Sequence, residues 1–94
     1  GGGFYENIPR ALPDGLSAKI EKKAVRTPPI FRLIQAEGNV PEKDMFNTYN
    51  MGVGMCCIVA KEEADRALEA LKAQGEDAYV LGEVVESDEG VILW

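Results

Sequence analysis

The sequence predicts an α+β fold, in which helices pack on a mixed, mostly antiparallel sheet. Apolar residues recur with helical spacing in some segments, whereas other short segments alternate or are wholly apolar, as strands are. The chain has 94 residues, 46% hydrophobic and 28% charged. This composition is typical of one globular domain rather than of a disordered segment. We therefore expect a single domain over residues 1–94.

The start of the chain predicts a short helix that is interrupted. Phe4, Ile8 and Leu12 are four residues apart, so they share one face of a helix. Pro9 lies inside this stretch, and proline removes a backbone hydrogen bond and crowds the preceding turn. The helix is therefore expected to kink near Ile8. A Pro-Asp-Gly turn follows within residues 12–15.

A strand and a helix with readable ends come next. Apolar and polar residues alternate over 16–20, which predicts a half-buried strand. The helix over 27–38 has Thr27 as a candidate cap, Pro28 at its first position and Gly38 as its stop. Its expected apolar face consists of Ile30, Phe31 and Ile34.

A short helix from about residue 41 to 49 is expected to precede a buried strand. The apolar stripe of this helix is Met45, Phe46 and Tyr49. Residues 53–60 are almost wholly apolar after a glycine, which predicts a central strand covered on both faces. The adjacent Cys56 and Cys57 would point to opposite faces of that strand. We expect buried thiols in a reducing compartment, with neither a mutual disulfide nor a shared metal.

The last third predicts a helix and a hairpin. The helix over 61–75 has acidic residues in its first turn and Gly75 as its C-terminal stop. Its apolar face consists of Ala64, Ala67, Leu68 and Leu71. Two strand-like segments, 77–87 and 90–94, flank a Ser-Asp-Glu-Gly turn and are predicted to pair as a hairpin. This order contains part of the ferredoxin-like pattern.

The charge distribution excludes some classes of function. A net charge of −6 argues against nucleic acid as the main partner, since phosphate binding needs a basic face. No apolar run approaches the roughly 20 residues of a membrane span. Histidine is absent, so a zinc site or a histidine-dependent catalytic pair is not expected in this chain. Residues 1–35 carry six basic and three acidic side chains, and an anionic ligand would be received best there.

Two glycine clusters are candidate binding loops. Gly1 to Gly3 precede the first helix, where free N–H groups favour an anion such as phosphate, although a linker or flexible leader has the same composition. The segment 48–55 places Asn50 beside a Gly-x-Gly pair, Gly52 and Gly54, which suits either close approach of a ligand or a bulge entering a strand. The third glycine of a dinucleotide fingerprint is missing.

Three motifs in order resemble one family. "GGGFYENIPRALPDG", "PPIFRLIQAEGNV" and "MFNTYNMGVGM" closely resemble the C-terminal part of aminoimidazole ribonucleotide synthetase, the phosphoribosylformylglycinamidine cyclo-ligase of purine biosynthesis. The strand-like "YVLGEVV" is also similar, and the resemblance spans practically the whole chain. In the family a His-Ile-Thr-like segment precedes the glycine run, so the resemblance implies that the glycines are native and that the chain is the later part of a second domain.

The resemblance implies a cytoplasmic, homodimeric, two-domain enzyme. Such an enzyme uses ATP to phosphorylate the amide oxygen of formylglycinamidine ribonucleotide, and ring closure then gives aminoimidazole ribonucleotide. ATP and Mg are held chiefly by an N-terminal domain that this chain does not include, so the chain alone is expected to be inactive. The expected partners are the small-molecule ribonucleotide substrate and that N-terminal domain, with no nucleic acid and no membrane.

The resemblance also implies a set of substrate-binding residues and no metal ligand. They are Gly1, Gly2, Gly3, Asn7, Arg10, Thr48, Asn50 and Gly52. None of these is an obvious general acid or base, so no catalytic residue is assigned. Tyr49 stands where the family commonly has phenylalanine, a small departure.

Two alternatives remain open. One is a related ATP-dependent enzyme of the same superfamily, making selenophosphate or thiamine diphosphate, against which "ENIPR" and "NMGVGM" speak. The other is a stand-alone ferredoxin-like module that binds a small ligand or regulates without catalysis.

Overall fold

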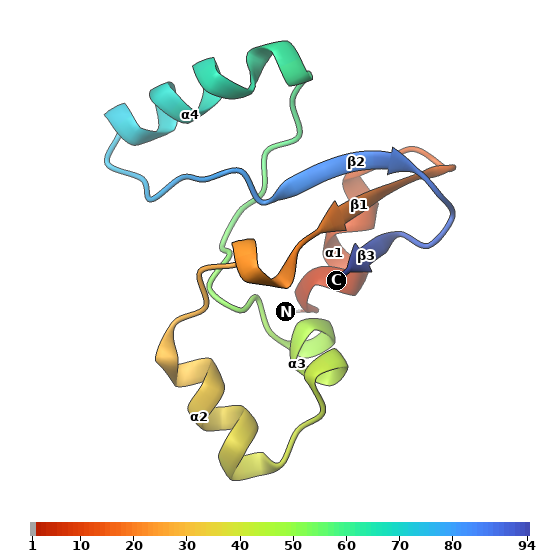
Figure 1. The fold of residues 1–94 in the computed structure, drawn as a ribbon, viewed down its shortest axis with the longest axis vertical. Helices are drawn as coiled ribbons and strands as arrows, with labels where there is room; N and C mark the ends of the chain where they lie inside the picture. The colour runs from red at the N-terminus through yellow and green to blue at the C-terminus, as the bar shows by residue number, and fades with distance from the viewer. Residues whose placement is uncertain (1) are drawn as a thin grey trace.

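The computed structural model describes residues 2–94, and Gly1 lies outside the described residues. Its centre is a three-stranded sheet in the order β2-β1-β3. Strand β1, Leu16–Ile20, pairs antiparallel with β2, Gly82–Glu86, and parallel with β3, Val91–Leu93. The described residues also form four α-helices, of which α1 (Gly3–Asn7) and α3 (Glu42–Thr48) lie nearest the sheet (Figure 1), so the α+β class is confirmed.

The expected kink at the start of the chain is confirmed. Helix α1, Gly3–Asn7, stops before the proline and continues as a 3-10 helix, Ile8–Ala11. Pro9 lies in the first turn of the 3-10 helix. A backbone N–H at that point has no partner within the helix, so the missing N–H of proline costs no hydrogen bond there. Leu12 closes it by donating its N–H to the Pro9 carbonyl at 3.0 Å.

Helix α2, Pro29–Gly38, has its ends one residue away from the prediction. Pro28 rather than Thr27 is the N-cap, because a residue before proline is held in the extended region and Pro29 follows it. At the other end Asn39, not Gly38, takes the left-handed conformation with φ of 50°. Ile30 on the predicted apolar face is 53% exposed, so only part of that face is covered within residues 2–94.

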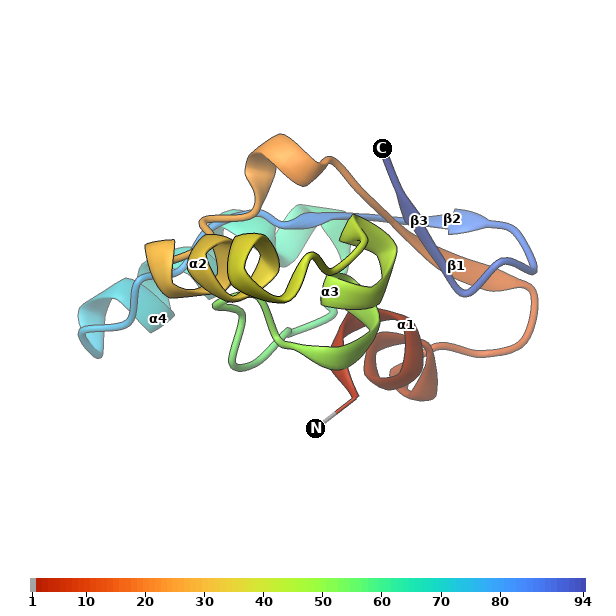
Figure 2. The same ribbon diagram turned by 90° about the horizontal axis from the view of Figure 1, so that it is seen from below.

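The core lies where α1 and α3, Glu42–Thr48, meet the same face of the sheet (Figure 2). Phe4 and Phe46 pack edge to face, with ring centroids 5.1 Å apart and an interplanar angle of 82°. Met45 is completely buried beside them. The remaining buried apolar residues are Ala18, Ile20, Val25, Met51 and Val91.

Ser17 is the buried polar residue of this core. Its hydroxyl donates to the Ser87 carbonyl at 2.9 Å and accepts the Gly90 N–H at 2.8 Å. These two bonds fix the turn that follows β2 against β1. Through this turn the chain crosses the end of β1, and β3 pairs with the opposite edge of β1. The predicted hairpin is therefore wrong: β2 and β3 do not pair with each other, because β1 lies between them.

The predicted central strand over 53–60 is also wrong. This segment has no regular secondary structure and belongs to no strand of the described chain, and Cys56 and Cys57 are exposed rather than buried. An apolar run is buried only where other elements cover it. In this sheet both edges of β1 are paired, with β2 and with β3, so this segment does not pair with β1.

Helix α4, Ala64–Ala73, follows this segment and ends as predicted. Gly75 has a φ of 86°, and it and Glu76 donate their N–H groups back to the last turn. The predicted face of Ala64, Ala67, Leu68 and Leu71 is half-buried, while the other side of the helix is exposed. In Figure 1 the helix lies at one end of the molecule, away from α2 and α3.

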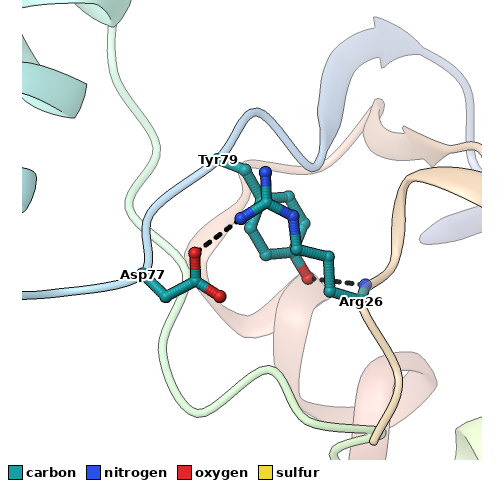
Figure 3. Close-up of polar contacts among 3 residues, drawn as sticks. All are labelled: Arg26, Asp77 and Tyr79. Atoms are coloured by element: carbon teal, nitrogen blue, oxygen red, sulfur yellow. Dashed lines mark hydrogen bonds and ion pairs between the residues drawn. The ribbon is translucent and has the colours of Figure 1, made fainter.

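A polar cluster attaches the segment after α4 to the rest of the fold (Figure 3). The Arg26 guanidinium donates to the Asp77 carboxylate at 2.5 Å and lies over the Tyr79 ring, 4.4 Å from its centroid. The Arg26 backbone N–H donates to the Tyr79 hydroxyl at 3.1 Å. These contacts hold the segment that precedes β2 against Arg26.

Candidate functional site

The two glycine clusters meet at one groove. Its volume is about 580 Å³, and it lies between the start of α1, the end of α3 and the exposed segment after them. The polar side chains among its lining residues include the amides of Asn7 and Asn50 and the hydroxyl of Thr48. The other lining residues are Gly3, Phe4, Ile8, Ala11, Phe31, Tyr49, Val53, Gly54, Met55, Cys56 and Ile58.

Glycine is required at the start of α1 because the backbone of α3 lies directly against it. Gly3 has a φ of 59°, and a Cβ there would contact the Phe46 carbonyl oxygen and lie 2.7 Å from the Tyr49 carbonyl oxygen. Gly2 has a φ of 121° and would bring a Cβ to 2.7 Å from the Asn7 side-chain nitrogen. Gly3 therefore fits the end of α3 so closely that no side chain can stand between them, whereas Gly2 faces the side chains of Glu6 and Asn7 on α1 itself.

The Asn7 side chain is bonded to the backbone of Gly3. Its side-chain nitrogen donates to the Gly3 carbonyl at 2.8 Å, across one turn of α1. An asparagine inside a helix competes for backbone groups, and this bond gives its side chain a partner within α1. Asn7 also lines the groove.

A tight turn shapes the opposite wall. The Asn50 side-chain oxygen accepts the Gly52 N–H at 2.8 Å, and the Asn50 carbonyl accepts the Val53 N–H at 2.9 Å. Met51, with φ of 53°, and Gly52, with φ of 95°, take the left-handed conformations this turn needs. Within residues 2–94, the Asn50 side-chain nitrogen has no protein partner, so it is able to donate to a ligand.

Three of the predicted site residues that the structure describes, Gly2, Arg10 and Gly52, are not among those that line the groove. Gly52 faces the other way: a Cβ there would contact the Pro28 ring and lie 3.1 Å from the Arg26 carbonyl oxygen. Close packing against Pro28 and Arg26 therefore explains why residue 52 is glycine. Arg10 is exposed on the 3-10 helix after α1. The structure thus brings together Gly3, Asn7, Thr48 and Asn50, while the roles of all the predicted residues remain predictions.

Some groove residues were missed by sequence reasoning. Phe31 comes from α2 and packs edge-on against Tyr49, with ring centroids 6.0 Å apart. No local pattern marks it, because the spacing of α2 shows only that Phe31 is apolar. Gly54 also lines the groove; the sequence placed it in the second glycine cluster but not among the substrate-binding residues.

The electrostatics of the groove come from neutral groups, since none of its lining residues is charged. Desolvation beside the groove, and then the adjacent Cys57, raises the pKa of the Cys56 thiol above its ordinary value, although much of this side chain is exposed. Among residues 2–94, no group of three or more His, Cys, Asp or Glu side chains is arranged to hold a metal ion. The groove therefore suits the polar part of an organic ligand that is recognised through hydrogen bonds.

In the described part of the chain, no helix combines the length and the apolar character needed to cross a membrane.

The sequence of this chain matches a known domain family. Over residues 1–94 the chain matches the family described as "AIR synthase related protein, C-terminal domain", and it belongs to that family. It is 50% identical over 93 residues to the phosphoribosylformylglycinamidine cyclo-ligase of Agathobacter rectalis. It is 53% identical over 93 residues to that of a Thermoanaerobacter species, and 48% identical over 94 residues to that of Staphylococcus carnosus.

These alignments cover 99% of this chain but only a part of each relative. The chain spans 27% of the Agathobacter and Staphylococcus proteins and 28% of the Thermoanaerobacter protein. The resemblance seen in the sequence is thus confirmed, and the chain corresponds to a C-terminal part of such proteins.

Proposed function

We propose that the full-length protein is an ATP-dependent cyclo-ligase that closes the imidazole ring of formylglycinamidine ribonucleotide, and that the groove holds part of this substrate. The observation that carries the proposal is that Gly3 and the 48–55 segment line one groove. They belong to two of the motifs shared with the cyclo-ligase family. The names of relatives that are 47–53% identical support the same reaction.

In the proposed reaction, the terminal phosphoryl group of ATP passes to the amide oxygen of the substrate. The neighbouring nitrogen then attacks the amide carbon, the carbon–oxygen bond breaks, and phosphate leaves as the ring closes and a proton is lost. ADP, phosphate and aminoimidazole ribonucleotide are the products. Residues 2–94 contribute binding and orientation, which lower the entropic cost of ring closure.

The groups available for this binding are a hydroxyl, an amide and backbone. Thr48 and Asn50 line the groove together with Gly3, whose backbone packs directly against residues 46–49. The Asn50 nitrogen serves as a donor to a substrate oxygen, since its side-chain oxygen is bonded to Gly52. ATP and Mg are assigned to the part of the protein before residue 1, because the groove offers no carboxylate to a metal.

Paired variants in the full-length enzyme separate this role from folding. Asn50→Asp keeps the oxygen that accepts the Gly52 N–H but removes the donating nitrogen. We expect kcat/KM to fall about 10- to 100-fold, since a lost hydrogen bond to a bound ligand is worth about 1–3 kcal/mol. The melting temperature should stay unchanged. Asn39→Asp makes the same chemical change at the exposed end of α2 and should leave kcat/KM as it is.

Full activity in Asn50→Asp would contradict the binding role of this residue. Thr48→Val, which removes the hydroxyl at nearly constant volume, should lower kcat/KM, and Thr48→Ser should restore most of it. Residues 1–94 alone should release no ADP in response to the ribonucleotide. Ring closure by that fragment would contradict the assignment of ATP to the rest of the protein.

The full-length protein is further proposed to be cytoplasmic and homodimeric, as the family resemblance implies. Sedimentation of the full-length protein tests the dimer: a single species with the mass of one chain at micromolar concentration would contradict it.

A further inference from the structure

The segment 53–60 has the composition of a buried strand but is exposed. Met55 is 85% exposed, Ile58 is 46% exposed and Val59 is 45% exposed. All eight residues are apolar or glycine, and no charge interrupts them. A continuous exposed apolar run of this kind marks an interaction surface, whereas single exposed apolar residues do not.

The backbone of this segment is also open. It has no regular secondary structure between the turn at Asn50 and the 3-10 helix Lys61–Glu63, and it pairs with none of the strands described in residues 2–94. Unpaired N–H and C=O groups beside apolar side chains form the edge on which another strand can add.

The occupant is indicated by where the chain enters the fold. Gly3 lines the same groove as Gly54, Met55 and Ile58, so polypeptide that leads into α1 arrives beside the open segment. The relatives are more than three times as long as this chain, which covers 27–28% of them. The matched family is a C-terminal domain, so most of that additional length precedes residue 1.

We propose that the polypeptide immediately before residue 1 in the full-length protein forms a β-strand that pairs with residues 53–60 and covers their apolar side chains. The pairing closes the open side of the groove and adds the segment to the folded domain. The inference rests on the path of the chain and on exposure, and it holds whatever reaction the enzyme performs.

Hydrogen exchange of the full-length protein tests the pairing directly. The backbone amides of 54–59 that face the added strand should exchange at least about 100-fold more slowly than in an unstructured peptide. The exposed loop residue Asp88 supplies an internal reference that should stay fast. Free exchange of all the amides of 54–59 in the folded protein would overturn the proposal.

Dilution distinguishes the preceding polypeptide from a second copy of the chain. Pairing within one chain does not depend on concentration, so protection should be the same from micromolar to nanomolar protein. Protection that disappears on dilution would overturn the proposal and assign the surface to a second copy.

The two exposed cysteines provide an independent readout. Cys56 and Cys57 are free thiols, and covering the segment removes them from solvent. In the full-length protein, both should react with a thiol reagent about 100-fold more slowly than in the same protein unfolded in urea, with each position identified by tandem mass spectrometry. Equal rates in the folded and unfolded protein would overturn the proposal. Neither measurement uses catalysis, so a failure here is distinct from a failure of the proposed reaction.

Discussion

Replacing Gly3 by alanine tests how closely the glycine run fits against α3. The change adds one methyl group at a position with φ of 59°, directed at the backbone of residues 46–49. Gly15→Ala is the matched control. It also has a positive φ, of 86°, but no atom lies within 4 Å of its added Cβ.

The magnitude follows from the difference between the two sites. Forcing a non-glycine residue into the left-handed region costs about 1–2 kcal/mol at either position. At Gly3 the added carbon also contacts main chain that cannot rotate away, and overpacking of this kind costs a further 1–3 kcal/mol, roughly. Gly3→Ala should therefore lower the free energy of unfolding by about 1–3 kcal/mol more than Gly15→Ala does.

Native-state hydrogen exchange in the full-length protein measures this difference domain by domain. The amides of Ile20 and Met45 lie in the core and report the opening free energy of this part of the chain. Equal losses in the two variants would refute the reasoning, because strain of φ alone would then account for both. A smaller loss in Gly3→Ala would refute it as well.

Three further outcomes are expected. Ser17→Ala leaves the Gly90 N–H and the Ser87 carbonyl without their hydrogen-bond partner. The free energy of unfolding, measured by denaturant titration, should therefore fall by about 1–3 kcal/mol. An unchanged free energy would contradict the role of the hydroxyl. Asp77→Asn breaks an exposed ion pair with Arg26 and should cost less than about 1 kcal/mol by the same titration, while speeding proteolysis between α4 and β2; a larger loss would show that the pair is not solvent-screened. The raised pKa of Cys56 favours the neutral thiol in the folded state, so its contribution to stability is complete below its ordinary pKa of 9.0 and is lost as the pH rises through the folded value. Cys56→Ser should remove that part of the pH dependence of the melting temperature, and an unchanged profile would contradict it.

The elements that could be predicted from the sequence depend on local rules. The break at Pro9, the strand at 16–20 and the stop at Gly75 each follow from the backbone preferences of the residues involved, and all are confirmed. The groove could be predicted in part. Gly3 and Asn50 belong to the two glycine-rich segments that the sequence indicates as binding loops, and both residues line the groove.

The errors concern pairing between distant segments. The apolar run at 53–60 predicts a buried strand correctly in composition, but burial depends on a neighbour that residues 2–94 do not supply. The prediction that β2 and β3 form a hairpin is wrong because the turn after β2 crosses the end of β1, where the buried hydroxyl of Ser17 binds its Ser87 carbonyl and its Gly90 N–H. A serine that is buried in a strand has no local signature, since serine is usually exposed.

The central place of β1 has a consequence for the order of folding during synthesis. Its partners are all late in the chain: Ser17 and Gly90, which are bonded to each other, are 73 residues apart. The Ile20 carbonyl accepts the N–H of Trp94 at 3.1 Å, and the Trp94 carbonyl accepts the N–H of Lys22 at 2.9 Å. While the ribosome is still translating this region, β1 therefore has an open edge on both sides, and closure of such long loops is slow. The nascent domain is exposed to misassociation until residue 94 has emerged, and chaperones that bind extended apolar strands would act in that interval.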